Sequence, residues 1–368
     1  MKWKKQLLHL TAYQPGKSTD AVKKEYGLSD IVKLASNENP FGCSKKAKKI
    51  LESMTESLAI YPDGYASNLR FPLAQSLKVN PDQLIFGNGS DEIILMISRA
   101  MLEQGKNTVM PAPTFPQYRH NAVVEGAEIR EVPLVDGEHD LNKMLQAIDH
   151  ETAIVWLCSP NNPTGTYITK EDILSFLRKV PSDVLVVLDE AYYEYVVAND
   201  YYDAIDLLNE FSNLIVLRTF SKIYGLASLR VGYGVASSEI IRALEPIREP
   251  FNVNTAALLA AEKALEDQEF VRYCREENRK GLEQFYQFCE KNSLTCMPSQ
   301  TNFVLIDFNT DGNEVFQYLL EKGYIVRSGQ ALGFPTSVRV TVGSQSQNEG
   351  IIKIMTEFLN EKAVVLKA

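Results

Sequence analysis

The chain has 368 residues, of which 45% are hydrophobic and 23% are charged, and its formal net charge is −9. This length predicts about two domains, and the composition is that of a soluble globular protein rather than a disordered or coiled-coil one. The acidic balance argues against a nucleic-acid-binding protein, which normally carries a basic excess.

Cysteine and histidine usage excludes several further classes. The five cysteines are scattered without a CxxC pair, and the four histidines form no HExxH-like cluster, so neither a disulfide framework nor a metal site is indicated. The N-terminal apolar run at residues 7–10 is too short for a signal peptide, and no stretch is long and apolar enough to span a membrane. We therefore expect a cytoplasmic protein that has no membrane or nucleic-acid partner and binds no metal.

Between about residues 80 and 235, short runs rich in Val, Ile and Leu alternate with helix-like segments such as Ser90–Leu102 and Lys170–Lys179. Nearly continuous apolar runs are typical of strands that are covered on both faces, and alternation with helices favours an α/β domain with a mostly parallel sheet. The expected strands are Gln83–Phe86, Asn107–Met110, Glu128–Pro133, Thr152–Cys158, Val184–Leu188, Asn213–Leu217 and Arg230–Val235.

The pattern changes beyond about residue 250. Asn254–Asn292 is predicted to be long and helical, and a strand at Asn302–Phe308 and a helix near Asn313–Lys322 follow. A strand pair around Tyr324–Arg327 and Ser337–Val342 and a final helix from residue 345 complete the chain. We therefore expect an N-terminal arm over 1–35, a large α/β domain over 36–250 and a smaller α+β domain over 251–368.

The first candidate site segment, Gly87–Glu92, lies between an expected strand and an apolar helix. Free backbone N–H groups at a helix start form a natural phosphate site. The segment lacks the third glycine of a dinucleotide motif and the Gly-Lys-Ser/Thr of a P-loop, which weakens NAD and ATP assignments. Simple capping by Ser90, with Asp91 and Glu92 favoured in the first turn, is the alternative.

Two further segments follow the next strands. Cys158–Gly165 contains Asn162 in a turn that proline and glycine make stiff, although an ordinary Asn-Pro turn would have the same sequence. Asp189 ends an apolar strand at the sheet edge where open α/β proteins bind ligands, and Tyr192 follows it. A carboxylate there could pair with a protonated pyridine nitrogen, and helix capping or Mg²⁺ binding are the alternatives.

Lys222 follows another buried strand within Thr219–Lys222. Burying an ammonium group is costly, whereas a lysine that condenses with an aldehyde is neutralised. The hydroxyls of Thr219 and Ser221 and the guanidinium of Arg230 could bind a phosphate monoester. Taken alone, a Ser-Lys pair is also common in surface loops.

Two arginines lie late in the chain: Arg327 follows Ile325 and Val326, and Arg339 interrupts a β-branched strand, where it would be half-buried. A buried guanidinium binds an anion, and bidentate capture of a carboxylate or phosphate is its strongest interaction. An internal salt bridge is the alternative.

The order and spacing of these motifs resemble the fold-type I aminotransferases that depend on pyridoxal 5′-phosphate (PLP), and within them the histidinol-phosphate aminotransferase subfamily. Asn-Pro-Thr-Gly is followed by Asp-x-x-Tyr and then by Ser-Lys with an arginine eight residues further on. The supporting segments are Thr11–Gln14, Ser36–Gly42, Tyr61–Asp63, Pro113–Phe115 and the strand around Arg339.

The resemblance implies a PLP-transferase fold and a role for each matching residue. Lys222 would form the Schiff base and move the proton, and Asp189 would hold the pyridine nitrogen. The anionic end of the substrate would be held by Arg339, Arg327 and Tyr13, with Asn37 as a further candidate. Asn162 and Tyr192 would contact the ring oxygen of the cofactor, and Phe115 would stack on the ring. The cofactor phosphate would be bound by Ser90, Asp91, Thr219, Ser221, Arg230 and, from a neighbouring subunit, Tyr61.

From the resemblance we expect a homodimer with a composite active site that transfers the amino group of L-histidinol phosphate to 2-oxoglutarate in histidine biosynthesis. Relatives often carry Tyr at the ring-stacking position. Phe115 keeps the stacking face but lacks the tyrosine hydroxyl, so any role of that hydroxyl in relatives is in question for this chain. The alternatives are an aromatic or broad-specificity aminotransferase, a threonine-phosphate decarboxylase, and the PLP-sensing module of a transcription regulator, against which the acidic charge argues.

Overall fold

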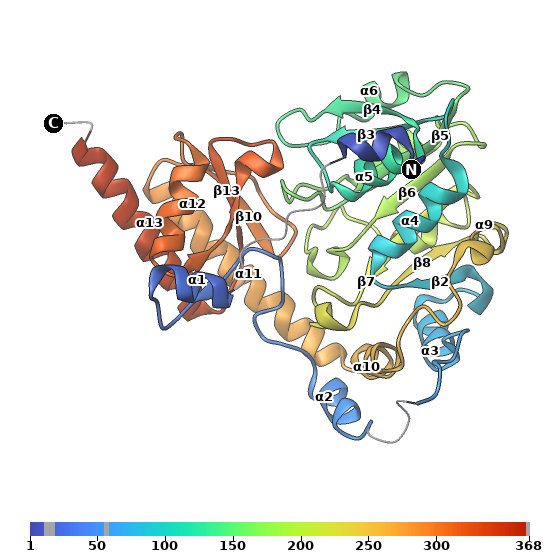
Figure 1. Cartoon of the computed structure of the whole chain (residues 1–368), viewed down its shortest axis with the longest axis horizontal. Coiled ribbons are helices and arrows are strands. Elements are labelled where there is room, and N and C mark those ends of the chain that lie inside the picture. Colours follow the sequence, from blue (N-terminus) through green and yellow to red (C-terminus); the bar gives the residue numbers. More distant parts are fainter. Residues whose placement is uncertain (11–18, 55–58, 366–368) are drawn as a thin grey trace.

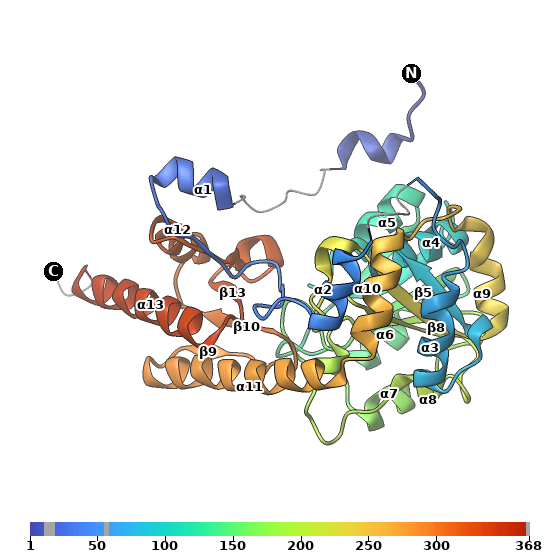
Figure 2. The same cartoon turned by 90° about the horizontal axis from the view of Figure 1, so that it is seen from below.

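The computed structural model describes residues 1–10, 19–54 and 59–365. Figure 1 shows a large α/β body built around a seven-stranded sheet and, beside it, a smaller body built around a four-stranded sheet. Figure 2 shows the long helix α11 (Gln268–Lys291) running along the small body toward the large one. Within the described segments, no helix is long and apolar enough to cross a membrane.

The large sheet has the mixed, mostly parallel arrangement that the sequence predicts. Its strands are β2 (Leu84–Gly87), β3 (Asn107–Ala112), β4 (Glu128–Pro133), β5 (Thr152–Cys158), β6 (Leu185–Asp189), β7 (Leu214–Thr219) and β8 (Gly232–Ala236). They lie in the order β2-β8-β7-β6-β5-β3-β4, and β8 is antiparallel to both of its neighbours. The carboxyl ends of β5, β6 and β7 therefore meet at one edge, where open α/β sheets bind ligands.

Helices cover both faces of this sheet, which is why its central strands are continuously apolar. Val186 and Leu188 of β6 face one core, while Leu185 and Val187 face the other. The second core contains residues of α4 (Ser90–Met101), α5 (Gln117–Glu125) and α9 (Ser238–Leu244). The first contains residues of α2 (Lys45–Glu52), α3 (Ser67–Leu77), α6 (Leu141–Gln146), α7 (Lys170–Leu177), α8 (Ala204–Leu207) and α10 (Thr255–Leu265).

The helical pattern predicted over Asn254–Asn292 is two helices rather than one. It breaks between α10 and α11, where the Asp267 carboxylate accepts the Phe270 N–H and caps the start of α11. An aspartate at this position competes with the helical backbone, which ends one helix and begins the next.

The four-stranded sheet has the order β12-β13-β10-β9 and packs against α11, α12 (Gly312–Glu321) and α13 (Gln345–Val365). The strand predicted over Tyr324–Arg327 is divided: Tyr324 and Ile325 form β11, which pairs with β1 of the N-terminal segment, and only β12 pairs with β13. The short strands are β1 (Val32–Lys33), β9 (Thr295–Cys296), β10 (Phe303–Asp307), β11 (Tyr324–Ile325), β12 (Arg327–Ser328) and β13 (Ser337–Thr341).

The N-terminal segment contacts both bodies. Residues 5–9 form a 3₁₀ helix beside α5, where Lys4 Nζ donates to the Val124 carbonyl. Helix α1 (Thr19–Tyr26) buries Val22 against Leu320 and Ile325 of the small body. The domain limits at residues 35 and 250 remain a prediction.

Candidate active site

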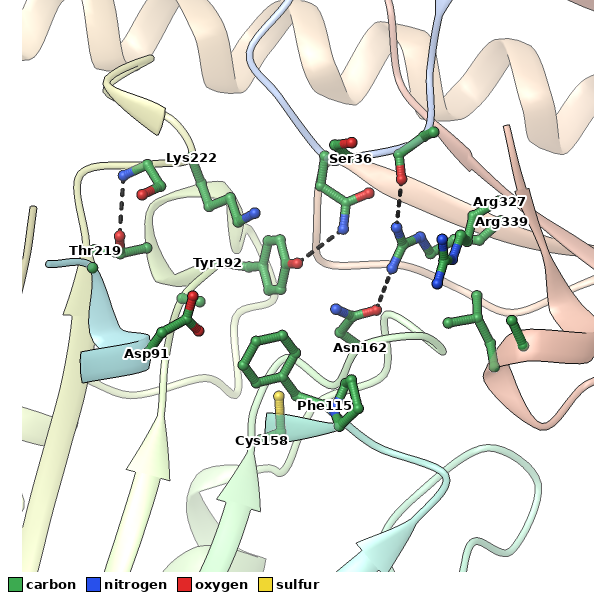
Figure 3. Close-up of a pocket in the computed structure, with 18 of the residues that line it drawn as sticks. Ser36, Asp91, Phe115, Cys158, Asn162, Tyr192, Thr219, Lys222, Arg327 and Arg339 are labelled. Carbon is green, nitrogen blue, oxygen red and sulfur yellow. Dashed lines mark hydrogen bonds between the residues drawn. The ribbon is translucent and has the colours of Figure 1, made fainter. Parts of the chain in front are cut away.

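A cavity of about 740 Å³ lies at the carboxyl ends of β5, β6 and β7 and is closed on the other side by β12 and β13. Figure 3 shows side chains from both bodies pointing into it. Its lining includes every site residue predicted from the sequence except Tyr13 and Tyr61: Asn37, Ser90, Asp91, Phe115, Asn162, Asp189, Tyr192, Thr219, Ser221, Lys222, Arg230, Arg327 and Arg339.

One end of the cavity is a cluster of hydrogen-bond donors at the start of α4. Arg230 Nη1 lies 3.3 Å from Ser221 Oγ, and its Nη2 lies 3.2 Å from the carboxylate of Asp91. The N-cap residue of α4 is Gly89, and no side chain caps this helix end. The alternative that Ser90 serves only as the helix cap is therefore wrong. The hydroxyls, the guanidinium and the free N–H groups of the first helical turn form a donor set that suits a phosphate monoester.

Two glycines at this end have neighbours so close that a side chain would not fit without a shift of its surroundings. Gly89 has φ +75°, and a Cβ there would lie 2.7 Å from Arg230 Nη2. A Cβ at Gly232 would lie 2.6 Å from the backbone nitrogen of Ser90. Two glycines therefore let β8 and Arg230 approach the helix start closely, which shapes a small cradle for an anion.

Asp189 lies at the floor of the cavity and is 2% exposed. Its Oδ2 accepts the hydroxyl of Tyr118 at 2.7 Å, and its Oδ1 accepts the Ala191 N–H at 3.1 Å. Burial raises the pKa of Asp189 to about 6. A cation bound beside the carboxylate would lower that pKa again, so the site favours a protonated ring nitrogen.

Lys222 is half-buried on the cavity wall, and its Nζ lies 5.6 Å from the centre of the Tyr192 ring. Burial, followed by the positive charge of Arg339, lowers the pKa of Lys222 to about 8. A larger fraction of its amine is therefore neutral near pH 7 than for an exposed lysine. A neutral amine is the form that attacks an aldehyde.

Asn162 and Tyr192 face the cavity between Lys222 and the arginines (Figure 3). The Asn162 side-chain oxygen accepts from Arg339 Nη1, and the Tyr192 hydroxyl accepts from Asn37 Nδ2 at 2.9 Å. Phe115 lines the cavity, and its ring lies edge-on to that of Tyr118 with the ring centres 5.6 Å apart. Asn161 is not among the residues that line the cavity, and its Oδ1 accepts the hydroxyl of Thr114.

Arg327 and Arg339 lie directly opposite each other on β12 and β13. Among the described residues, Arg327 forms no ion pair, and Arg339 donates to the side-chain oxygen of Asn162 and to the Ala35 carbonyl. Two guanidinium groups at paired positions repel each other, and an anion between them would relieve this repulsion.

Two predicted residues are not placed in the cavity. Tyr13 lies outside the described residues. Tyr61 is 78% exposed and stacks on Phe251 with ring centres 4.9 Å apart, away from the cavity of its own chain. Its expected contact therefore depends on a second subunit.

Sequence reasoning missed three features of the site. Tyr118 donates its hydroxyl to Asp189, but it lies in a helix whose sequence contains no recognisable motif. Its ring stacks on Trp156 with the ring centres 4.8 Å apart. Arg218 does not line the cavity but is buried next to Thr219, and its Nη2 lies 2.8 Å from Glu190 Oε2. The third is the contact of Thr341 with Asn37. The sequence did contain a signal for the buried ion pair. Glu190 comes directly after Asp189 and Arg218 directly before Thr219, so an acidic and a basic residue lie at the ends of neighbouring strands.

Comparison with known proteins gives consistent matches over nearly the whole chain. The family model "Aminotransferase class I and II" matches residues 29–354. Histidinol-phosphate aminotransferases from Geobacillus sp. strain WCH70 and Geobacillus thermodenitrificans strain NG80-2 are 63% and 60% identical, covering 99% and 98% of this chain and 100% and 99% of theirs. The crystal structure of histidinol-phosphate aminotransferase from Sinorhizobium meliloti in complex with pyridoxal-5′-phosphate superposes with a TM-score of 0.90, 25% identity and 98% coverage of both chains.

Proposed function

Because the chain belongs to the class I and II aminotransferase family, we propose that it transfers the amino group of L-histidinol phosphate to 2-oxoglutarate. The products are imidazole-acetol phosphate and L-glutamate, and the reaction is a step of histidine biosynthesis. Relatives that are 60–63% identical over nearly the full chain carry the name of this enzyme.

The residues present fit pyridoxal phosphate as the cofactor. The cradle formed by Ser90, Ser221, Arg230 and Thr219 suits its phosphate, and the buried Asp189 suits its ring nitrogen. When bound, the cofactor supplies an aldehyde that condenses with amines and a ring that accepts electrons.

The chain's own residues then bind, orient and move protons. The Nζ of Lys222 would take up the α-proton of the amino donor in the first half-reaction and supply a proton to the α-carbon of the acceptor in the second, because its lowered pKa leaves it able to act as a base near neutral pH. The Asp189 carboxylate, held at both oxygens, would keep the ring nitrogen of the cofactor protonated. Asn162 and Tyr192 would hold the oxygen of the cofactor ring, and Phe115 would pack against the ring.

The opposed pair Arg327 and Arg339 is the observation that carries the substrate assignment. A carboxylate can be held by one bidentate guanidinium, whereas a phosphate dianion has three oxygens and more charge, which two guanidinium groups can share. The pair accepts the phosphate of histidinol phosphate in one half-reaction and the carboxylate of glutamate in the other.

A direct assay tests the function. With 2-oxoglutarate as acceptor, we expect kcat/KM for L-histidinol phosphate to exceed that for L-phenylalanine by about 100-fold, because the phosphate gains an additional charged contact. A preference for phenylalanine would indicate the aromatic aminotransferase instead. Release of carbon dioxide from threonine phosphate without a keto acid would indicate the decarboxylase.

Replacing Arg339 with lysine should weaken substrate binding. Arg339→Lys keeps the charge but loses the fork of donors, so we expect KM for histidinol phosphate to rise by about 10- to 100-fold with a smaller change in kcat. Steady-state kinetics measures both. The same substitution at the exposed Arg272 of α11 is the control and should leave KM unchanged. An unchanged KM in Arg339→Lys would remove Arg339 from the substrate site.

We propose further that the enzyme is a homodimer whose sites are shared between subunits. Ile60, Tyr61, Tyr65 and Phe251 are large apolar side chains exposed close to one another, and Tyr61 stacks on Phe251. Such exposed clusters are typical of interfaces. Tyr61 of one subunit would then contact the cofactor phosphate of the other.

Hybrid dimers test the shared site. Tyr61→Ala and Lys222→Ala chains should each be impaired alone, but a co-expressed hybrid contains one site with both residues intact. Random pairing should restore about a quarter of wild-type activity. Hybrids without recovered activity, or a protein that sediments with the mass of one chain, would contradict the proposal.

We also propose a cytoplasmic location. All five cysteines are free in the structure, which suits a reducing compartment.

A further inference from the structure

Thr341, at the end of β13, is connected to the cavity through two hydrogen-bonded residues. Its Oγ1 accepts the backbone N–H of Asn37 at 3.0 Å and lies 3.0 Å from Asn37 Oδ1, to which it donates. The Nδ2 of Asn37 donates to the Tyr192 hydroxyl at 2.9 Å. Thr341 and Asn37 are 3% and 2% exposed, so water does not compete for these bonds.

The bonds of Thr341 determine which way the Asn37 amide faces. A threonine hydroxyl has one hydrogen and two acceptor lone pairs. Its oxygen accepts the Asn37 N–H, and its single hydrogen is donated to Asn37 Oδ1. The amide therefore presents its NH₂ group to Tyr192. The Tyr192 oxygen accepts this bond, and its own hydrogen remains available for an acceptor in the cavity.

We propose that Thr341 is a positioning residue that, through Asn37, directs the hydroxyl hydrogen of Tyr192 toward the ring oxygen of the cofactor. The inference rests on the proposed function, since it assigns Tyr192 to the cofactor ring. If the Asn37 amide were reversed, its oxygen would face Tyr192 and would hold that hydrogen instead.

The backbone around Asn37 keeps this arrangement rigid. Asn37 has φ +56°, a left-handed conformation that asparagine tolerates better than most residues. Its carbonyl accepts Asn302 Nδ2 at 3.0 Å, and the Thr341 N–H donates to the Leu34 carbonyl at 2.8 Å. Thr341 also shares one face of β13 with Arg339, two residues earlier, so one strand orients both the substrate anion and the Tyr192 hydroxyl.

The charged and titratable groups that face Tyr192 include Arg339 on β13, Asp189 on β6, Cys158 on β5, Lys222 after β7, and Tyr195, three residues after Tyr192 itself. None of them bonds to the Thr341 side chain among the described contacts. A substitution at Thr341 therefore changes the hydroxyl direction while leaving these charges in place.

The test is a pH titration of the absorbance of the bound cofactor. A hydrogen bond from Tyr192 stabilises the anionic form of the ring oxygen, so its loss should raise the apparent pKa of the bound chromophore. We expect Thr341→Val, which keeps the shape and removes the hydroxyl, to raise that pKa by about one unit. Thr341→Ser, which keeps the hydroxyl, should titrate as the wild type. Equal titrations of Thr341→Val and wild type would overturn the inference.

A double-mutant cycle separates the relay from a general structural effect. In a Tyr192→Phe background there is no hydroxyl to direct, so Thr341→Val should produce no further shift; a persisting shift would contradict the inference. If Thr341→Val does not bind the cofactor, Asn37→Asp carries the test, because its carboxylate can only accept and would hold the Tyr192 hydrogen. An unchanged titration of Asn37→Asp would overturn the relay.

Failure of the inference is distinguishable from failure of the proposed function. If the wild type shows no cofactor absorbance, or does not transfer amino groups from histidinol phosphate, the function is wrong. If the wild type does both and the Thr341 and Asn37 variants titrate as the wild type, only the relay is wrong.

Discussion

Replacing Lys222 with alanine is expected to lower the rate of amino transfer by about 10⁴-fold. Alanine has no amine to link to the aldehyde of the cofactor and no Nζ to carry the α-proton, so two functions are lost together. Burial lowers the pKa of Lys222 to about 8, so its amine is available as a base near neutral pH, and its Nζ lies 5.6 Å from the centre of the Tyr192 ring. Steady-state kcat with histidinol phosphate and 2-oxoglutarate measures the loss.

A matched control separates this effect from a general loss of lysine. Lys179 is exposed just after α7, and Lys179→Ala should retain kcat within about twofold, as expected for a surface substitution. Cofactor content, measured after denaturation, should show whether Lys222→Ala still binds pyridoxal phosphate through its phosphate cradle. A Lys222→Ala protein within about tenfold of wild-type kcat would contradict the assignment.

Asp189→Asn is the substitution with the second-largest expected effect. Asparagine fits the same space and can still accept the Tyr118 hydroxyl, but it has no charge to keep the ring nitrogen protonated. We expect kcat/KM to fall by about 10³-fold, the size found when one preorganised electrostatic contact at a reacting group is removed. The same kinetic assay measures it.

Asp203→Asn is the control for Asp189→Asn. Asp203 pairs with Arg218 at 2.7 Å, and its side chain is 41% exposed and does not line the cavity. Asparagine can keep its cap of α8, so kcat/KM should change by less than about threefold. Equal losses in the two variants would show that acidic charge in this region, rather than the ring contact of Asp189, controls the rate.

The large fold was predictable because its signals are local. Strands β5 to β7 are continuously apolar, and this pattern requires cover on both faces, which the two helical layers provide. The break between α10 and α11 was not predicted, because Asp267 could be an ordinary helical residue until its side chain is seen to cap α11. The division of β11 and β12 depends on pairing with the distant β1, which no local pattern records.

The cofactor side of the site was predictable for a related reason. Asp189 ends β6, and Asn162 and Lys222 come shortly after β5 and β7. The carboxyl ends of these parallel strands meet at one edge. By contrast, the Thr341–Asn37 bond joins residues 304 positions apart, and neither residue type suggests the other. Tyr118 likewise gains its function only because α5 packs beside β6.

Chemical trapping of the cofactor tests the central claim most directly. Borohydride reduces a carbon–nitrogen double bond to a stable linkage, so treatment of the cofactor-loaded protein, digestion and mass spectrometry identify the modified lysine. We expect the label on the peptide that contains Lys222, and no label in Lys222→Ala. A label on any other lysine, or an unlabelled wild-type protein that still transfers amino groups, would contradict the account.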